Sequence, residues 1–574
     1  MAIRITLTLL SLVVVSAGTA VPAAGAMYYL DCAEGNDARD GLSPERPWKT
    51  LTRVSTHRFR PGDSIHFKRG TVCAGMLWPK GSGAPGAPIT LTAYGTGPLP
   101  KIQSGPQYVA AFRLFNQEYW RVESMEFAGG QPYGIWISGD KGVLHQIHLK
   151  NIVVHDVTGE VGKQKETGLI IISPGSVEQR FDDVLVDGAT AYNTTQWAGI
   201  LVGGGDFGFP PESTRSTNVV VRNSIVHDVQ GDGIVLFRVI HGLIEKSVAW
   251  HTGMQFKETI GTPNGIWTWM CRDCTVQYNE AFLTDSPGID GGAFDIDYGN
   301  ADNVLQHNYG HDTQGYCIAV FGAGWVTTNS VVRDNLCVNN GVSPRLARHQ
   351  GAITLSTWDD GKLKGVRMEN NTVVWSPAVD APAVRSTADF VGQPGIFKRN
   401  IIRSTRRPWI ADKHGSLRLE DNVVEDLESV DGGKRPANGA HAQRPAAPVM
   451  DLPSSLAPYA GKWLLVSQID TGETSRSHVV MLQSVREQYR ANGLQVVLQG
   501  KVGPNAAHDW HLRDIPILQP GGDQSTAARP TTMLLSPTRA VVARWKGFVP
   551  PAVLGAALRR HLGPPNFGGM LVYH

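Results

Sequence analysis

The sequence has no excess of charge of one sign and little charge overall. It contains 53 Lys and Arg against 51 Asp and Glu, which gives a formal net charge of +2, and charged residues make up 18% of the chain. Such a balance excludes the strong basic field with which proteins attract nucleic acid or anionic membrane surfaces. We therefore expect no nucleic-acid partner.

Long apolar runs are missing after the first 26 residues, so the sequence predicts no membrane span there, because a span needs about 20 apolar residues. The first segment has Arg4, an apolar run from Ile5 to Val15 and a small-residue end at Ala24-Gly25-Ala26. This order is typical of a secretory signal peptide, with an uncleaved anchor as the alternative. We predict cleavage after Ala26 and a secreted or periplasmic protein with no membrane span after cleavage.

Cysteine is scarce, but its count of six is even, as is common in exported proteins with disulfides. Cys32 and Cys73 are candidates for a disulfide near the N-terminus. Cys317 and Cys337 are 20 residues apart, a spacing suited to neighbouring coils of a repeat. Cys271 and Cys274 lack a second Cys/His pair at the spacing of a zinc site. A structural bridge or two buried thiols is the preferred interpretation of that pair.

An internal repeat is the main positive signal in the chain. Asn223, Ser247 and Asn279 begin a series of anchors, each followed by a short apolar strand, that continues at residues 308, 335, 371, 400 and 422. The anchors are separated by 24, 32, 29, 27, 36, 29 and 22 residues. A repeat of this length predicts a solenoid in which each coil buries its apolar face only against its neighbours. We expect the asparagines to form a hydrogen-bonded ladder with a structural role.

The segments 27–51, 61–70 and 88–95 resemble the N-terminal cap of secreted parallel β-helix proteins of the pectate-lyase-like superfamily. Among these proteins, the sequence of the three segments is most similar to family 9 polysaccharide lyases and their uncharacterised relatives. The resemblance implies an all-β right-handed parallel β-helix over residues 27–428, including the cap. It also implies a carbohydrate-active protein with a polysaccharide as its substrate.

Three histidines follow anchors of the repeat by four residues each: His155 follows an earlier anchor, Asn151, and His227 and His251 follow Asn223 and Ser247. Repeat positions align between coils, so we interpret them as a stacked column at a turn. A metal cluster is the less favoured alternative.

The composition changes after residue 428. Residues 429–457 are rich in Pro, Ala and Gly and show no periodicity, as in a linker. Residues 458–574 alternate strand and helix patterns: a strand at 463–469, a helix at 479–491, a strand at 494–498, a hairpin at 529–547 and a helix at 552–562. This alternation predicts a small C-terminal α/β domain.

The order of these elements resembles thioredoxin-like domains of the redoxin type, with Pro530 at the position of their cis-proline. Where such domains carry Cys-x-x-Cys, this chain has the segment 471–478, and no cysteine occurs after residue 337. Thiol–disulfide exchange requires a thiolate, so we expect no redox catalysis here. A scaffold role or a protein partner for this domain is the remaining expectation.

One stretch of the repeat carries the candidate chemistry. Side chains alternate along a strand, so inward Ile266 and Thr268 place Trp267 and Trp269 outward. In the next coils the same rule turns Asp295, Asp297, Ala319 and Phe321 outward, and before them Val235 and Phe237. Coils stack at about 4.8 Å, so these side chains are expected to form two adjacent columns on one face.

Outward aromatic rings are unfavourable unless something covers them. Sugar rings have apolar faces that stack on aromatic rings, so Trp267, Trp269 and Phe321 are candidate substrate-binding residues. The alternative is that a loop, such as residues 341–350, lies over them.

Asp295 and Asp297 are the candidate catalytic carboxylates. Two chemistries fit them. A calcium ion held by Asp295, Asp297 and the loop carboxylates Asp285 or Asp290 neutralises a uronate and acidifies its C5 proton in a lyase. Alternatively, one carboxyl is the acid and the other the nucleophile or base of a glycoside hydrolase.

A lyase also requires a base, a role that falls to a lysine near the calcium in family 9. Basic candidates lie nearby in the sequence: Lys257, which precedes the tryptophan strand, and His311, Arg238 and Arg272. The Asn-Thr-Asp and Gly-His-Gly motifs of polygalacturonases and the Asp-Pro-His-Asp motif of mannuronan epimerases are absent. The first hypothesis is therefore a calcium-assisted lyase of acidic polysaccharide. A non-catalytic carbohydrate-binding or adhesion solenoid is the second, and a glycoside hydrolase the third.

Overall fold

The structure is a computed structural model. It describes residues 25–159, 165–204, 215–253, 262–377, 379–426, 454–470, 473–500 and 531–563, and short pieces at 512, 515–518 and 565. Residues 1–24 of the predicted signal peptide, most of the predicted linker, Lys257 and Pro530 lie outside the described residues.

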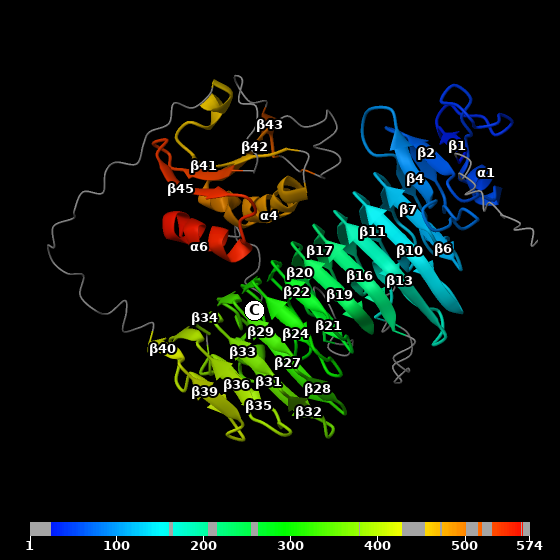
Figure 1. The fold of residues 1–574 in the computed structure, drawn as a ribbon. Coiled ribbons are helices and arrows are strands. Elements are labelled where there is room, and N and C mark those ends of the chain that lie inside the picture. Colours follow the sequence, from blue (N-terminus) through cyan, green and yellow to red (C-terminus); the bar gives the residue numbers. More distant parts are fainter. Residues whose placement is uncertain are drawn as a thin grey trace, which may run out of the picture.

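Three long parallel sheets run along the first part of the chain and form a solenoid (Figure 1). Successive coils contribute one strand to each sheet, so strands of one sheet pair in parallel with the strands of the coils before and after. The 14-stranded sheet consists of β1 (Met27–Leu30), β2 (Ser64–Lys68), β4 (Ile89–Tyr94), β7 (Trp120–Glu123), β10 (Gly142–Lys150), β13 (Gln179–Asp187), β16 (Ser216–Arg222), β19 (Val239–Glu245), β22 (Thr275–Gln277), β25 (Val304–Gln306), β29 (Val331–Arg333), β33 (Arg367–Glu369), β36 (Gly395–Lys398) and β39 (Leu417–Glu420).

The other two sheets follow the same order of coils. The 13-stranded sheet consists of β3 (Val72–Ala74), β5 (Lys101–Gln103), β8 (Glu126–Ala128), β11 (Val153–Val157), β14 (Thr190–Thr194), β17 (Ile225–Val229), β20 (Val248–Thr252), β23 (Glu280–Phe282), β26 (Tyr309–His311), β30 (Leu336–Val338), β34 (Thr372–Trp375), β37 (Ile401–Ser404) and β40 (Val423–Asp426). The 11-stranded sheet consists of β6 (Phe112–Phe115), β9 (Tyr133–Ser138), β12 (Gly168–Ile172), β15 (Ala198–Gly203), β18 (Ile234–Phe237), β21 (Ile266–Trp269), β24 (Phe294–Ile296), β27 (Ile318–Ala323), β31 (Ile353–Trp358), β35 (Val384–Thr387) and β38 (Ile410–Asp412).

Smaller elements complete the solenoid. They are α1 (Leu51–Thr56) near the N-terminus, α2 (Pro344–Ala347) in a loop, and the paired short strands β28 (Val326–Thr328) and β32 (Lys362–Lys364). Among the described residues, no helix has both the length and the apolar character needed to cross a bilayer.

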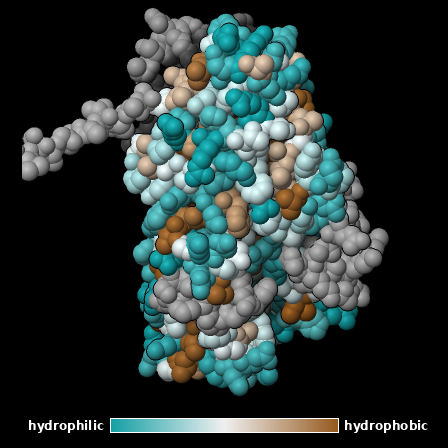
Figure 2. Space-filling model, turned by 90° about the vertical axis from the view of Figure 1, so that its right-hand side faces the viewer, coloured by the Kyte–Doolittle hydropathy of each residue, from teal (hydrophilic) through white to brown (hydrophobic). Residues whose placement is uncertain are grey.

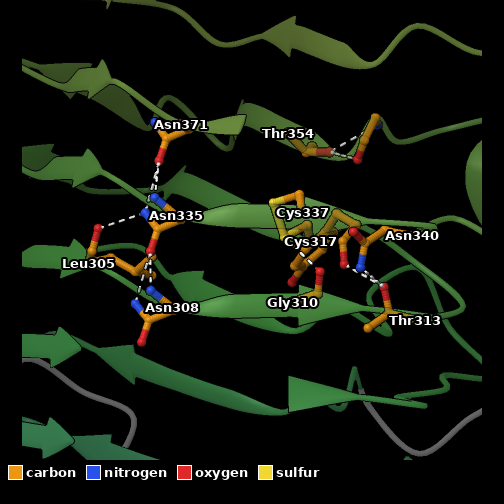
Figure 3. The surroundings of a disulfide bond; sticks show 12 residues. Leu305, Asn308, Gly310, Thr313, Cys317, Asn335, Cys337, Asn340, Thr354 and Asn371 are labelled. Atoms are coloured by element: carbon orange, nitrogen blue, oxygen red, sulfur yellow. Dashed lines mark hydrogen bonds between the residues drawn. A yellow bond between two sulfur atoms is a disulfide. The ribbon is translucent and has the colours of Figure 1, made fainter. Parts of the chain in front are cut away.

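A single apolar core runs the length of the solenoid between the three sheets, and its members are almost fully buried. The predicted asparagine ladder lies at the edge of this core and is confirmed (Figure 3). Asn308 Nδ2 donates to Asn335 Oδ1 at 3.1 Å, and Asn335 Nδ2 donates to Asn371 Oδ1 at 2.9 Å. The ladder starts at Asn279 and ends at Asn422. Each amide also donates to a main-chain carbonyl, for example Asn335 to Leu305, so the ladder satisfies buried polar groups at the turn.

The cysteines pair as predicted. Cys32 bonds to Cys73, and Cys317 bonds to Cys337 between neighbouring coils (Figure 3). Cys271 and Cys274 are free and buried in the core, which confirms the interpretation as two buried thiols.

A column of stacked rings runs across the strands of the 13-stranded sheet. The rings of His155, Tyr192 and His227 are stacked with centroids 5.0 Å apart, and the column continues through Trp250 and Phe282 to His311. The predicted stacking is thus confirmed for His155 and His227, but both lie within strands, β11 and β17, and not at a turn. His251 is outside the column, and its Nδ1 lies 3.1 Å from Asp228 Oδ1.

A separate α/β unit follows the solenoid in sequence. Its mixed sheet has the order β43 (Ile517–Leu518), β42 (Leu494–Gln499), β41 (Trp463–Gln468), β44 (Thr531–Leu535) and β45 (Val541–Lys546), of which the first three are parallel. Its helices are η2 (Ser454–Tyr459), α4 (Glu473–Tyr489), η3 (Arg490–Asn492) and α6 (Pro551–Leu562). The α/β character predicted from the sequence is confirmed.

This α/β unit packs on the outer face of the 13-stranded sheet, with α4 and α6 on the side of the solenoid (Figure 1). Val480 and Met481 of α4 bury against Val248 and Phe282 of the sheet. On the face shown in Figure 2, by contrast, most of the surface is hydrophilic and the hydrophobic patches are small and separate.

At the centre of this interface lies the buried carboxylate of Glu280. Ser484 Oγ and Gln488 Nε2 donate to it at 2.8 and 2.6 Å, and His311 Nε2 lies 3.2 Å from its Oε1. A carboxylate buried among apolar side chains is stable only when its oxygens are paired in this way. This group of Glu280, His311, Ser484 and Gln488, here called the buried node, therefore fixes the position of the α/β unit on the sheet.

The charge of His311 predicts a pH dependence for the interface. Burial alone lowers the pKa of His311, but hydrogen bonds to Asp312 and Glu280 and their charges raise it from 6.5 to about 9. The stabilisation from the protonated ring is therefore complete below about pH 6.5 and is lost as the pH rises toward 9. We expect the melting temperature to fall over this range, and to fall less in His311→Gln; an equal slope in both proteins would contradict the assignment.

Candidate functional site

The outward face of the 11-stranded sheet has the composition that strand alternation predicts. Trp267 aligns with Val235 and Asp295 in one column, and Trp269 aligns with Phe237 in the next. The alternating residues Ile266, Phe294 and Ile318 belong to the solenoid core instead. The prediction of two adjacent outward columns is confirmed.

The two tryptophans on this face are covered, contrary to their prediction as open sugar-binding residues. Trp267 is 2% and Trp269 is 3% exposed, and both belong to a second apolar cluster with Leu201, Val235 and Phe237. Phe321 is also buried, against Tyr316 and Ala319. In the loop at 341–350, Arg345 on α2 donates to the carbonyls of Ser286 and Gly288.

Next to this cluster, three of the predicted carboxyls come together, and a fourth that the sequence did not indicate joins them. The charges of Asp290 and Asp297 raise the pKa of Asp295, the charge of Asp290 raises the pKa of Asp297, and the charge of Asp232 raises the pKa of all three. Asp232 follows the turn before β18 and is completely buried.

Hydrogen bonds fix two of these carboxyls. Asp232 accepts from the main-chain N of Asn264 at 2.9 Å and from Trp197 Nε1, and Asn264 Nδ2 reaches Asp295 Oδ2 at 3.5 Å. Tyr316 Oη donates to the side-chain oxygen of the same Asn264 at 2.9 Å. The other oxygen of Asp295 is buried without a hydrogen-bond partner.

Burial dominates the acid–base behaviour of the cluster. It raises the pKa of Asp290 and of Asp297 to about 7, and with the charges of Asp297 and Asp290 it holds the pKa of Asp295 well above its ordinary value. Burial also raises the pKa of Asp232. Near neutral pH the cluster therefore contains both protonated and ionised carboxyls, as acid–base catalysis requires.

One cation acts on the whole cluster. Lys165 lowers the pKa of all four aspartates by its charge, and its Nζ lies 4.7 Å from the ring centroid of Trp267 and 5.3 Å from that of Trp197. Neither Lys165 nor Asp232 was predicted from the sequence, because both belong to earlier coils than Asp295. Asp232 lies just before β18, as Thr262–Gly265 lie just before β21 in the next coil. Aligning these two coils was the signal that could have identified Asp232.

The remaining candidates lie elsewhere. His311 belongs to the 13-stranded sheet, under the α/β unit, so the prediction that it acts beside Asp295 is wrong. Arg238 is buried with its guanidinium 5.1 Å from the Trp269 ring, and Arg272 faces Asp302 of the next coil at 4.0 Å. Asp285 accepts a hydrogen bond from the N of Ser286, and burial raises its pKa while the charge of Arg345 acts to lower it. Asp285 is not among the groups whose charge shifts the pKa of Asp295. Lys257 is outside the described residues.

The predicted calcium site gains no support from the geometry. Within the part of the chain that the structure describes, no three His, Cys, Asp or Glu side chains are arranged to hold a metal ion. Asp232 and Asp295 are buried, Asp290 and Asp297 are half-buried, and the pKa of each is raised above its ordinary value, whereas a calcium ligand has to be ionised. We derive no catalytic step through calcium.

Comparison with known proteins agrees with this architecture. The sequence model of the family described as "Right handed beta helix region" matches residues 109–373. The solenoid is a right-handed parallel β-helix. The resemblance to this fold is therefore confirmed, whereas the resemblance of the α/β unit to thioredoxin-like domains gains no support from the comparisons.

Two relatives share the fold over much of the chain. The curated lacto-N-biosidase of Bifidobacterium longum subsp. longum is 24% identical over 519 aligned residues, which cover 73% of this chain and 31% of that protein. This chain thus spans about a third of the length of the curated relative that it matches. The crystal structure of the GH136 lacto-N-biosidase from Eubacterium ramulus matches with a TM-score of 0.50 and 22% identity, over 70% of this chain and 68% of that chain. Neither relative supports the resemblance to family 9 lyases.

Proposed function

We propose that this β-helix protein is a glycoside hydrolase whose catalytic groups come from the carboxyl cluster at Asp295. The observation that carries the proposal is the pairing of one carboxyl with a strongly raised pKa and others with a pKa of about 7. Hydrolysis of a glycosidic bond needs one protonated carboxyl as acid and one ionised carboxyl as nucleophile or base. Elimination from a uronate instead needs a neutralising cation, and the described residues include no group of three His, Cys, Asp or Glu side chains arranged to hold one.

The roles follow from the environment of each group. Asp295 is the acid: burial and the neighbouring carboxylates keep its proton in place until the leaving oxygen takes it. Asp297, which follows it by two residues on the same face, or Asp290 from the preceding loop, is the ionised partner. The partner either attacks the anomeric carbon or removes a proton from the attacking water. Lys165 favours the ionised form of that partner by its charge.

The substrate class follows from the names of the relatives. Both are lacto-N-biosidases, and we propose that this chain releases a similar neutral disaccharide from a longer sugar chain. The predicted signal peptide and the two disulfides suit an exported enzyme. For the α/β unit we propose a thioredoxin-like arrangement without redox activity, because residues 454–574 contain no cysteine.

The direct test follows nitrophenolate release from p-nitrophenyl lacto-N-bioside by the purified mature protein, with and without a calcium chelator. We expect release that the chelator does not change. Unsaturated ends from alginate or pectate, lost on chelation, would establish the lyase instead. Binding of sugars without any cleavage would leave the carbohydrate-binding solenoid as the better description.

A further inference from the structure

An exposed tryptophan stands at the rim of the carboxyl cluster. Trp358 ends β31 and is 42% exposed, unlike the buried Trp267 and Trp269 on the same sheet. Its ring packs edge-on against two others, Phe321 at 5.5 Å and Tyr298 at 6.2 Å between centroids. Tyr298 directly follows Asp297, so these rings lead from the cluster to the surface.

The main chain around Trp358 is fixed although its indole is exposed. Its carbonyl accepts from the N of Gly324 at 3.2 Å and from the N of Gly361 at 2.9 Å, and the residue pairs with Ala323 of the preceding strand. On its other side Tyr298 packs against the buried ring of Trp269. The indole is therefore held in one place, so a ring that stacks on it loses little free energy to ordering of the protein.

The charges around this tryptophan decide which sugar suits it. Asp359 and Asp360 follow it directly in an exposed turn. Of the cations, Lys362 pairs with Asp389 at 3.2 Å, and Arg238, whose charge acts on Tyr298, is buried beside Trp269. Asp297 adds a further carboxyl on the inner side. Carboxylates so close repel uronates and sulfated sugars, whereas they accept hydrogen bonds from the hydroxyls of a neutral sugar.

We propose that Trp358, with Tyr298 beside it, forms a binding subsite for an uncharged sugar ring next to the catalytic carboxyls. The inference rests on the proposed function and specifies it further, since it selects neutral over acidic sugar chains. It differs from the expectation drawn from the sequence, which placed the stacking rings at Trp267 and Trp269.

Binding of uncleaved disaccharides tests this subsite independently of catalysis. Isothermal titration of the intact protein with lacto-N-biose and lactose is compared with titration of digalacturonate. We expect only the neutral sugars to bind, about 10-fold more weakly to Trp358→Ala, a loss of about 1.4 kcal/mol, and nearly normally to Trp358→Tyr. Trp78→Ala, at a partly exposed tryptophan near the opposite end of the same sheet, is the matched control and should bind as the wild type does.

Three results would overturn the subsite. They are equal binding by Trp358→Ala and the wild type, preferential binding of digalacturonate, and no binding of either neutral sugar to the wild type. Unchanged thermal unfolding of the alanine variant excludes a folding defect. Failure of the hydrolase proposal is seen separately, as sugar binding that depends on Trp358 in a protein that cleaves no glycoside.

Discussion

Replacing Asp295 with asparagine is expected to lower kcat by about 10²–10⁴-fold, the usual contribution of a general acid. The amide has nearly the same shape and keeps the contact with Asn264, but it has no proton to give to the leaving oxygen. The measurement is the rate of aglycone release from p-nitrophenyl lacto-N-bioside under saturating substrate. A leaving group of low pKa needs less protonation, so the loss should be smaller for dinitrophenyl than for nitrophenyl glycosides.

Asp285→Asn is the matched control for this prediction. Asp285 lies in the loop before the cluster and was a candidate calcium ligand, but in the structure it faces the N of Ser286 and the charge of Arg345. We expect its activity to stay within about 3-fold of the wild type, far less than the loss of a general acid. An equal loss in both variants would favour a shared metal site over the acid–base assignment.

Replacing Glu280 with alanine is expected to have the largest effect on stability, about 3–5 kcal/mol, which is typical of breaking a buried ion pair. The change removes the acceptor for Ser484 and Gln488 and leaves the protonated His311 with Asp312 as its remaining carboxylate. The expected result is a lower urea midpoint for the α/β unit and faster proteolysis within α4. Activity toward a small glycoside should fall much less, because Glu280 and Asp295 lie on different sheets.

Glu425→Ala provides the comparison for a carboxylate outside the interface. Glu425 pairs with Arg403 at 2.7 Å, but both side chains are exposed by more than a third. Such a surface pair contributes about 0–1 kcal/mol. If Glu280→Ala cost no more than Glu425→Ala, the buried node would not hold the α/β unit on the sheet.

Most of the fold could be predicted because each coil has to bury its apolar face in the same way. An apolar strand, a turn and an asparagine recur, so the repeat predicted the solenoid, the ladder from Asn279 to Asn422 and the direction of every side chain on β21 and β24. The pairing of Cys317 with Cys337 followed from the same spacing. The packing of α4 on the 13-stranded sheet could not be predicted, because no periodic signal relates Glu280 to Ser484.

The candidate site was predicted in part. Alternation placed Asp295 and Asp297 on one outward face, but it could not tell whether the neighbouring tryptophans are open or covered. Burial of Trp267 depends on residues from earlier coils, such as Leu201 and Lys165, which meet it only when the coils stack. His311 was misplaced because sequence distance from Asp295 is short, although the two residues belong to different sheets of the solenoid.

The contact between Glu280 and α4 also bears on the order in which the chain folds. Ser484 follows Glu280 by 204 positions, so during synthesis the 13-stranded sheet is complete at this coil long before its cover exists. Ile225, Val248 and Phe282 then form an apolar strip on a nascent solenoid, which is a surface that attracts other unfinished chains. Late docking of α4 removes that strip, so the α/β unit protects the protein from aggregation once its own strands have formed.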